Sequence, residues 1–338
     1  MIGSALIGIL GIVLIAVANY DAIKTTLSAS SSGPFTNRFI SQIWAVLLFI
    51  HKRYPNHQRL AAVGPWMTVG LMITWLLFIL LGWWLLFCAS PFAVVNADTQ
   101  QPADAIERLY YAGYTLTTLG YGDYVPGSDG WRMAPIIAAA NGFFLFTLTI
   151  TYMLNIVANV TEKRQTALNI SALGTTPWQI LEATHANGQF SSLSQQLQIL
   201  QPSIGKLGQQ YLAYPILHYY HDKAHDKSLA LALTRLYQAL LIARESYPDI
   251  DSATKQQMTI SLKIIEGFIV TLDSAFILAL KHPPRPPNLE AYSSLSGLRL
   301  SPEGLKQLLN TEHQKVLAAY VHKDGWKWGD VWSNSRTE

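Results

Sequence analysis

A nine-residue run from Thr115 to Asp123 has the residue types and spacing to bind a dehydrated cation. Its sequence is T-L-T-T-L-G-Y-G-D. A potassium ion leaves water only where a protein supplies a similar shell of oxygens, and the backbone carbonyls of an extended loop can supply it. Turning those carbonyls to one side requires backbone angles that a residue with a Cβ resists, so glycine is expected at alternate positions. Gly120 and Gly122 are those positions.

The other side chains of the run suit the same task. The Thr118 hydroxyl can add an oxygen at the inner end, the Tyr121 ring can turn outward to brace the strand, and Leu119 can pack behind it. Asp123 would draw cations to the outer mouth. The predicted ion-coordinating set is therefore Thr118, Leu119, Gly120, Tyr121 and Gly122. The chain holds one such run, so a closed ring of carbonyls predicts a homotetramer.

Long apolar segments surround this run. Of the 338 residues, 50% are hydrophobic and only 13% are charged, whereas a soluble domain carries about 25% charged residues. Since a helix needs about 20 mostly apolar residues to cross a membrane, we expect spans at Ile2–Tyr20, Trp66–Ser90 and Met133–Val160. The first lacks the basic start and cleavage site of a signal peptide, so it is interpreted as a retained anchor.

A shorter apolar segment, Phe39–Ile50, is too short to span and is expected to lie in the membrane interface. Lys and Arg are enriched in cytoplasmic loops, and they occur between the first two spans and after the third. They are Lys24, Arg38, Lys52, Arg53, Arg59, Lys163 and Arg164. The loop between the second and third spans then faces outward and is acidic. If Phe39–Ile50 does span, only the amino terminus changes side.

The run Thr115–Asp123 matches the potassium-channel signature T-x-T-T-x-G-Y-G-D at every fixed position. The chain therefore resembles the bacterial channels of this family that have one two-helix pore domain, over roughly residues 66–164. The resemblance implies a pore helix at Ala103–Thr117, a selectivity filter after it, and a pore-lining inner helix that begins at Arg132. No arginine-rich span precedes the pore, so a voltage sensor of the family type is not expected.

The resemblance also implies roles for the residues of the pore helix. Tyr110 and Tyr111 occupy the places where the family puts a cuff of aromatic rings around the filter. Tyr114 stands where some bacterial members carry a carboxylate, which leaves open whether this chain inactivates as they do. Thr115 and Thr117 complete the set of pore-helix residues expected to support the filter.

In the third span, Gly142 lies at the separation from the filter where many family members place a gating hinge. A glycine inside a helix serves either bending or close packing, and both interpretations stand. Thr147, Ile150 and Thr151 are candidates for a water-filled cavity, since hydroxyls are tolerated on faces away from lipid. For Asn141, a hydrogen bond from its side-chain amide to a neighbouring helix is a commoner explanation than a direct functional role.

The second half of the chain is predicted to be an all-helical cytoplasmic domain. Thr176-Pro177 is typical of a helix start, and residues 267–280 are expected to form a buried core helix because Asp273 lies among them. Helices are predicted at 204–222, 228–246, 252–281 and 302–322, with an extended linker at 282–287. No phosphate-binding glycine loop occurs.

Three histidines, His218, His221 and His225, are predicted to lie on one face of a helix. They could bind a divalent metal or sense pH, although a solvated helix end is the favoured interpretation. Residues 211–218, Y-L-A-Y-P-I-L-H, loosely resemble the tail of a group of bacterial channel-like proteins. The one cysteine, Cys88, excludes an internal disulfide.

The sequence thus predicts an α-helical membrane protein with an anchor region at 1–65, a pore domain at 66–164 and a cytoplasmic domain at 165–338. Its expected function is passive potassium conduction, controlled through the cytoplasmic domain by an unknown ligand. The alternative is a signalling or scaffold protein that uses the pore module as an oligomerising anchor. Neither enzymatic activity, a cofactor nor nucleic-acid binding is expected. The expected location is the plasma membrane, as a multi-pass protein of a bacterial inner membrane in contact with lipid.

Overall fold

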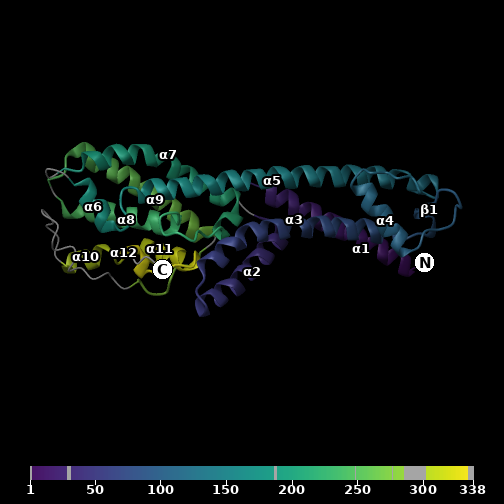
Figure 1. The fold of residues 1–338 in the computed structure, drawn as a ribbon, viewed down its shortest axis with the longest axis horizontal. Helices are drawn as coiled ribbons and strands as arrows, with labels where there is room; N and C mark the ends of the chain where they lie inside the picture. The colour runs from purple at the N-terminus through teal and green to yellow at the C-terminus, as the bar shows by residue number, and fades with distance from the viewer. Residues whose placement is uncertain are drawn as a thin grey trace. The chain divides into compact units, whose positions relative to one another are not determined.

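The computed structural model describes residues 2–28, 32–185, 189–247, 249–275, 277–284 and 302–333, and most of them are helical (Figure 1). The first half contains α1 (Ile2–Leu27), α2 (Pro34–Arg53), α3 (His57–Cys88), α4 (Ala105–Leu116) and α5 (Met133–Ser171). The short strands β1 (Val95–Asn96) and β2 (Tyr124–Val125) pair antiparallel. The second half contains α6 (Pro177–Thr184), α7 (Ser191–Ala213), α8 (Leu229–Ser246), α9 (Ser252–Ala275), α10 (Pro302–Leu308), α11 (Glu312–Lys323) and α12 (Gly329–Trp332). The 3-10 turns are η1 (Pro91–Ala93), η2 (Asp129–Trp131) and η3 (Pro215–Tyr219).

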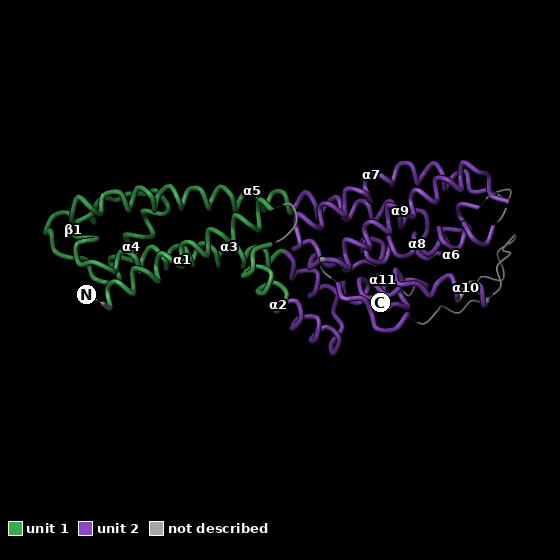
Figure 2. The backbone as a smooth tube through the Cα atoms, turned by 180° about the vertical axis from the view of Figure 1, so that it is seen from behind, with its two compact units in different colours: residues 1–41, 65–156 green, residues 42–64, 157–338 purple. Residues whose placement is uncertain are grey.

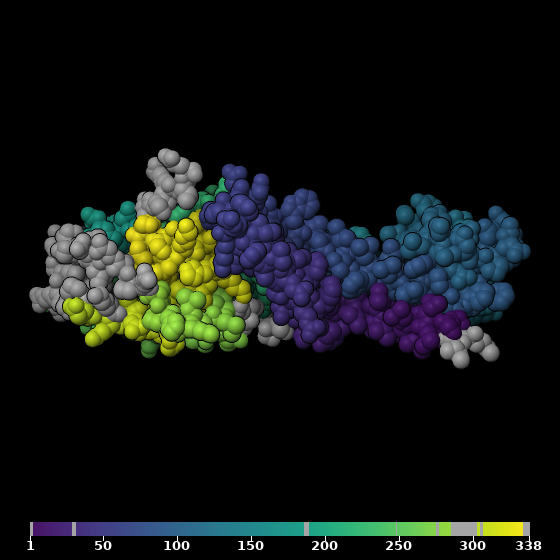
Figure 3. All heavy atoms as spheres, turned by 90° about the horizontal axis from the view of Figure 1, so that it is seen from below, coloured from purple at the N-terminus to yellow at the C-terminus, as the bar shows by residue number. Residues whose placement is uncertain are grey.

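Three segments of the described chain are long and apolar enough to cross a membrane: Gly3–Leu27, His57–Cys88 and Asp129–Ser171. They overlap the three predicted spans to within two residues at the outer ends of the first two, and α2 is not among them. The surface of α1, purple in Figure 3, exposes half or more of each of Leu6, Ile9, Leu10, Ile12 and Val13. Apolar surface of this extent is typical of contact with lipid. The prediction of a helical membrane protein is confirmed.

The chain forms two compact units (Figure 2). Unit 1 comprises residues 1–41 and 65–156, and unit 2 comprises residues 42–64 and 157–338. These bounds differ from the three-part division at 65 and 164, because the N-terminal helix packs with the pore segment and residues 42–64 pack with the C-terminal helices. The three-part division stays a prediction about which regions perform which task.

Small and polar side chains bring the helices of unit 1 together. A Cβ added to Gly11 of α1 would lie 2.6 Å from the carbonyl oxygen of Gly82 in α3, so the two glycines allow close approach. Farther along α1, the buried Asp21 carboxylate accepts hydrogen bonds from the Phe35 amide and the Trp75 indole, both at 2.9 Å. One carboxylate thereby joins α1 to α2 and α3.

Asn141 joins α5 to the same group of helices. Its amide nitrogen donates to the Asn19 side-chain oxygen at 2.7 Å, and its oxygen accepts from the Trp83 indole at 3.1 Å. Satisfying neighbouring helices is therefore the role that the structure gives to Asn141, as expected from the sequence.

Unit 2 is built around α8, which is buried along almost its whole length. The buried Arg235 donates to the Asp330 carbonyl at 2.7 Å, and the Gln238 and Gln314 amides donate to each other at 2.5 and 3.0 Å. α9 packs on α7, α8 and α11. Phe268 is 2% exposed, in agreement with a buried core helix rather than a span. The described residues of unit 2 confirm the predicted all-helical domain.

Three predicted helices were wrong in extent. The helix expected at 252–281 ends at Ala275, and residues 277–280 are not helical. The helix expected at 204–222 begins earlier and ends at Ala213, because Pro215 cannot continue it. The helix expected at 302–322 is two helices, and the second starts after Thr311. By contrast, Thr176 caps α6 as expected, with its hydroxyl accepting from the Gln179 amide at 3.1 Å. Residues 285–287 of the expected linker lie outside the described residues.

Candidate functional site

The pore helix predicted at Ala103–Thr117 is α4, which begins with a reciprocal cap. The Asp104 carboxylate accepts from the Glu107 amide at 2.8 Å, and the Glu107 carboxylate accepts from the Asp104 amide at 2.7 Å. This capping box fixes the start of the helix. The carbonyl end of a helix carries partial negative charge. In α4 this end is at Leu116, so the residues that follow Leu116 lie in a field that favours a cation.

The backbone of residues 118–122 alternates between unusual and ordinary conformations. Its φ angles are +60° at Thr118, +56° at Gly120 and +83° at Gly122. No atom lies within 4 Å of a Cβ added to either glycine, so the backbone angle, not space, requires glycine there. A β-branched residue such as Thr118 rarely adopts positive φ, and such strain gathers at functional sites.

Hydrogen bonds and tyrosine rings hold this segment in place. The Leu119 amide donates to the Tyr114 carbonyl at 2.9 Å. The Tyr121 ring stacks on Tyr110 with centroids 6.2 Å apart and meets the edge of Tyr114 at 5.9 Å. The Tyr114 hydroxyl in turn donates to the Tyr124 carbonyl at 2.7 Å. The structure thus brings Tyr110 and Tyr114 against the segment, whereas the Tyr111 ring meets Phe87 and Tyr114.

The remaining residues predicted around the segment differ in burial. Tyr111 and Thr115 are buried, and the Thr117 hydroxyl donates to the Gly113 carbonyl at 2.9 Å. Leu119 is 61% exposed, so it does not pack behind the segment within one chain as predicted. The Asp123 side chain is exposed at the far end of the segment.

Gly142 serves close packing between α5 and α4. A Cβ added to Gly142 would lie 2.8 Å from the carbonyl carbon of Leu116 and closer still to its oxygen. α5 continues as one helix on both sides of this position. Of the two interpretations, the structure favours packing.

The candidate cavity residues Thr147, Ile150 and Thr151 are exposed on α5 in the single chain. The Thr147 hydroxyl donates to the Phe143 carbonyl, and the Thr151 hydroxyl to the Thr147 carbonyl, both at 2.9 Å. Each hydroxyl therefore donates its hydrogen within α5, and its oxygen can still accept a hydrogen bond from water.

Gly142→Ala is expected to lower the free energy of unfolding by about 1–3 kcal/mol, because the added methyl overpacks against a backbone carbonyl. The measurement is the thermal unfolding midpoint of the purified protein in detergent. Gly70→Ala is the matched control, since Gly70 lies within the span α3 and has nothing within 4 Å of an added Cβ. Equal midpoints for the two variants would contradict the packing role.

The three histidines do not form one site. The His218 ring meets the edge of Tyr211 at 4.5 Å, whereas the His225 ring packs against Trp326 at 4.4 Å. Among the residues that the structure describes, no group of three or more His, Cys, Asp or Glu side chains could hold a metal ion. The predicted metal set is not assembled, because the chain leaves the helix at Ala213. The expectation of a solvated helix end is also wrong, since His218 and His221 are buried.

Sequence reasoning missed a structural junction that we call the connector, residues 214–222. The buried Lys163 ammonium, near the end of α5, donates to the carbonyls of Leu217 at 3.2 Å and Tyr220 at 2.7 Å. A Cβ added to Gly64 in α3 would lie 2.9 Å from the Tyr220 ring. The connector therefore contacts both α3 and α5. Its signal in the sequence was the lysine after the third apolar segment, which was interpreted only as a mark of orientation.

His221 adds a titratable group to the connector. Its Nε2 lies 3.0 Å from His57 Nδ1, and its Nδ1 lies 3.9 Å from an Asp324 carboxylate oxygen. Burial, together with the nearby His57, Lys163 and His51, lowers the pKa of His221 to about 3. Burial also raises the pKa of Asp324 to about 6. Both groups are therefore held toward their neutral forms.

Acidification is expected to destabilise unit 2 through His221. Its folded pKa of about 3 lies below the unfolded value of about 6.5, so stability falls by up to about 1.4 kcal/mol per pH unit below about pH 6.5. Asp324, whose pKa is raised to about 6, acts in the opposite direction and offsets part of this loss. The measurement is the unfolding midpoint at about pH 7.5 and about pH 5.5. His221→Gln should show the smaller change, and an identical change in both proteins would contradict the assignment.

Comparisons with known proteins agree with a membrane pore. Residues 66–159 match the family model described as "Ion channel". The uncharacterized membrane protein YdjJ of Bacillus subtilis (strain 168) is 26% identical over 324 residues, which cover 95% of this chain and 94% of that protein. No solved structure matches. The segment that contains α4 and residues 118–122 is thus similar to an ion-channel domain, within a chain similar to a bacterial membrane protein.

Proposed function

We propose that the chain is one subunit of a tetrameric potassium-selective channel. The observation that carries the proposal is the alternation of positive φ at Thr118, Gly120 and Gly122, directly after α4. Alternation of this kind can turn successive carbonyl groups to one side, as in the carbonyl rings of potassium-channel filters. Four copies around an axis would then replace the hydration shell of potassium with carbonyl oxygens. The match of residues 66–159 to an ion-channel family supports conduction.

The surfaces left exposed in one chain support the assembly. Leu119 and Tyr121 are 61% and 64% exposed beside the segment, and Phe143 of α5 is 67% exposed. One chain supplies one strand, so a ring of carbonyls requires several copies, and four is the number in channels with this signature. Thr147, Ile150 and Thr151 would line the cavity below the ring, and Asp123 would attract cations at its mouth.

Control of the pore would come from unit 2. The connector holds the first turns of α3 and the last turns of α5 through Gly64 and Lys163. A change in the C-terminal helices would therefore reach the inner helix through the connector. The excess of Lys and Arg at these helix ends supports a cytoplasmic location for unit 2. The spans of unit 1 would then cross a bacterial inner membrane.

The test is ion flux into liposomes that contain the purified full-length protein. Potassium uptake far above sodium uptake is the expected result, and cross-linking in the same liposomes should give a tetramer. Equal uptake of both ions would overturn selectivity. If neither ion enters over a range of pH and voltage while the tetramer persists, the result would instead favour an oligomerising anchor for a signalling or scaffold protein.

A further inference from the structure

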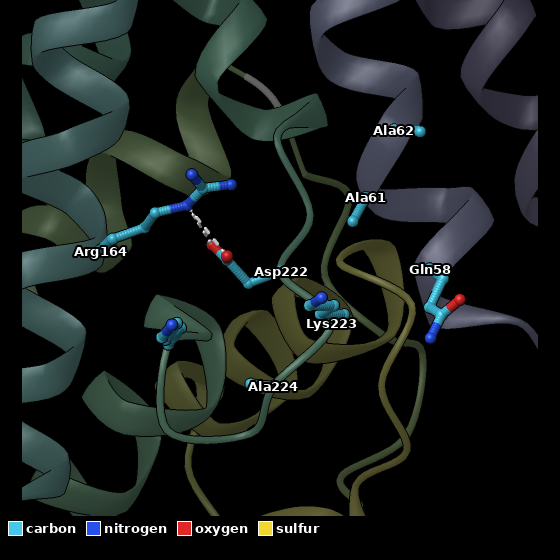
Figure 4. A pocket seen from close by; sticks show the side chains of 8 residues that line it. Gln58, Ala61, Ala62, Arg164, Asp222, Lys223 and Ala224 are labelled. Carbon is cyan, nitrogen blue, oxygen red and sulfur yellow. Dashed lines mark hydrogen bonds and ion pairs between the residues drawn. The ribbon is translucent and has the colours of Figure 1, made fainter.

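A cavity of about 470 Å³ lies in unit 2 between the first turns of α3 and the end of α5 (Figure 4). In Figure 4, Arg164 extends toward it from α5, Gln58, Ala61 and Ala62 lie across from it on α3, and the loop that carries Asp222 passes between them. The lining residues are Gln58, Ala61, Ala62, Arg164, Asp222, Lys223, Ala224 and Lys227.

The charge of the lining is unbalanced. It contains three cationic side chains and one carboxylate, Asp222. That carboxylate is buried, lies 2.9 Å from Arg164 Nε as an ion pair, and accepts a hydrogen bond from the same nitrogen at 3.2 Å. The pair fixes the guanidinium plane and leaves both terminal nitrogens of Arg164 without a partner among the described residues. Lys223 and Lys227 are exposed, and neither side-chain ammonium makes a hydrogen bond or ion pair within the described chain.

Such a lining suits a phosphate group. An arginine with two free terminal nitrogens donates to two oxygens of one phosphate, and lysines add point charges from the side. The Gln58 amide offers a further donor, while Ala61 and Ala62 give an apolar wall for the carbon atoms of an ester.

We infer that this cavity binds a phosphate-bearing anion. The headgroup of an anionic phospholipid is the source that its position favours, because Ala61 lies near the start of His57–Cys88 and Arg164 near the end of Asp129–Ser171, two helices that contain stretches apolar enough to cross a membrane. Basic pockets between spans on the cytoplasmic side hold such headgroups. A soluble phosphate has the same chemistry and is distinguished by experiment. The inference does not depend on conduction.

The test is binding to the full-length protein in phosphatidylcholine nanodiscs. Dioctanoyl phosphatidylglycerol is titrated in one arm, dioctanoylglycerol without phosphate in a second, and glycerol 3-phosphate in a third, with native mass spectrometry and the unfolding midpoint as readouts. In Lys223→Gln/Lys227→Gln, both changes are at exposed side chains and should leave the fold intact. Since each charge-assisted hydrogen bond contributes roughly tenfold or more, affinity should fall at least about tenfold.

The control is Lys255→Gln/Lys263→Gln, which removes two lysines that line a different surface hollow on α9. If Lys223→Gln/Lys227→Gln loses phosphatidylglycerol binding and the control variant keeps it, the result would support a lipid headgroup as the ligand. Binding of glycerol 3-phosphate with the same pattern, and no preference for the lipid, would support a soluble source. Equal weakening in both variants, or no binding in either phosphate arm, would overturn the inference. Arg164→Gln gives an independent second variant should the lysine variant fail to fold.

Discussion

Gly120→Ala is expected to abolish potassium-selective flux in liposomes without unfolding the protein. Gly120 has φ +56° and no atom within 4 Å of an added Cβ. Within one chain the methyl therefore meets no neighbour, and the change acts through the backbone. Alanine in the left-handed region costs about 1–2 kcal/mol, which is enough to rotate the peptide and remove one carbonyl per subunit from the ring. Four subunits repeat the defect, so no intact set of oxygens remains.

The matched control is Gly113→Ala, in α4 and only seven positions earlier. Gly113 also has nothing within 4 Å of an added Cβ, but it is helical and its φ is not positive. Alanine is favoured over glycine in a helix, so this variant should conduct normally. Potassium and sodium flux are measured for both proteins, beside circular dichroism. Selective flux through Gly120→Ala equal to that of the unmodified protein would argue against a carbonyl filter at residues 118–122.

Lys163→Met should lower the free energy of unfolding by about 2–6 kcal/mol, because each of two buried carbonyls left without a donor costs about 1–3 kcal/mol. The Lys163 side chain is 2% exposed and donates to the carbonyls of Leu217 and Tyr220. Methionine matches its length but leaves both carbonyls buried without a donor. These contacts join α5 to the connector. Any control of potassium flux by unit 2 should therefore be lost in Lys163→Met.

The control for this change is Lys206→Met. Lys206 forms an exposed ion pair with Glu162 at 2.8 Å, and such pairs contribute about 0–1 kcal/mol. Thermal unfolding in detergent, followed by circular dichroism, measures both variants. A similar small shift for Lys163→Met and Lys206→Met would mean that the buried lysine does not hold the connector.

The membrane part of the fold was predictable because a bilayer imposes strict conditions. Spans must be long, apolar and helical, so α1, α3 and α5 were recognised from composition. The pore helix followed from the signature, although its expected range began at Ala103 and the helix starts only after the Asp104 cap. The glycines at 120 and 122 were predictable because the reason for them is local: a backbone angle that other residues resist.

The connector was not predictable, because its contacts join residues far apart in the sequence. Lys163 meets Leu217, and His57 meets His221, only after the C-terminal helices have packed. The periodicity of the histidines suggested one helical face, yet Pro215 ends that helix first. The positive charge of the cavity between α3 and α5 was likewise not predictable, because it depends on Arg164 and residues 222–227 coming together in the folded chain.

The amide pair between Asn19 and Asn141 has a consequence for a protein that works in an electric field. A unit charge moved across a membrane gains about 2.3 kcal/mol per 100 mV, so links made of carboxylates or ammonium groups are pulled when the voltage changes. Neither amide carries a net charge or titrates at physiological pH. The tie between α1 and α5 should therefore hold at any voltage, and the N-terminal helix should stay with the inner helix while other contacts change.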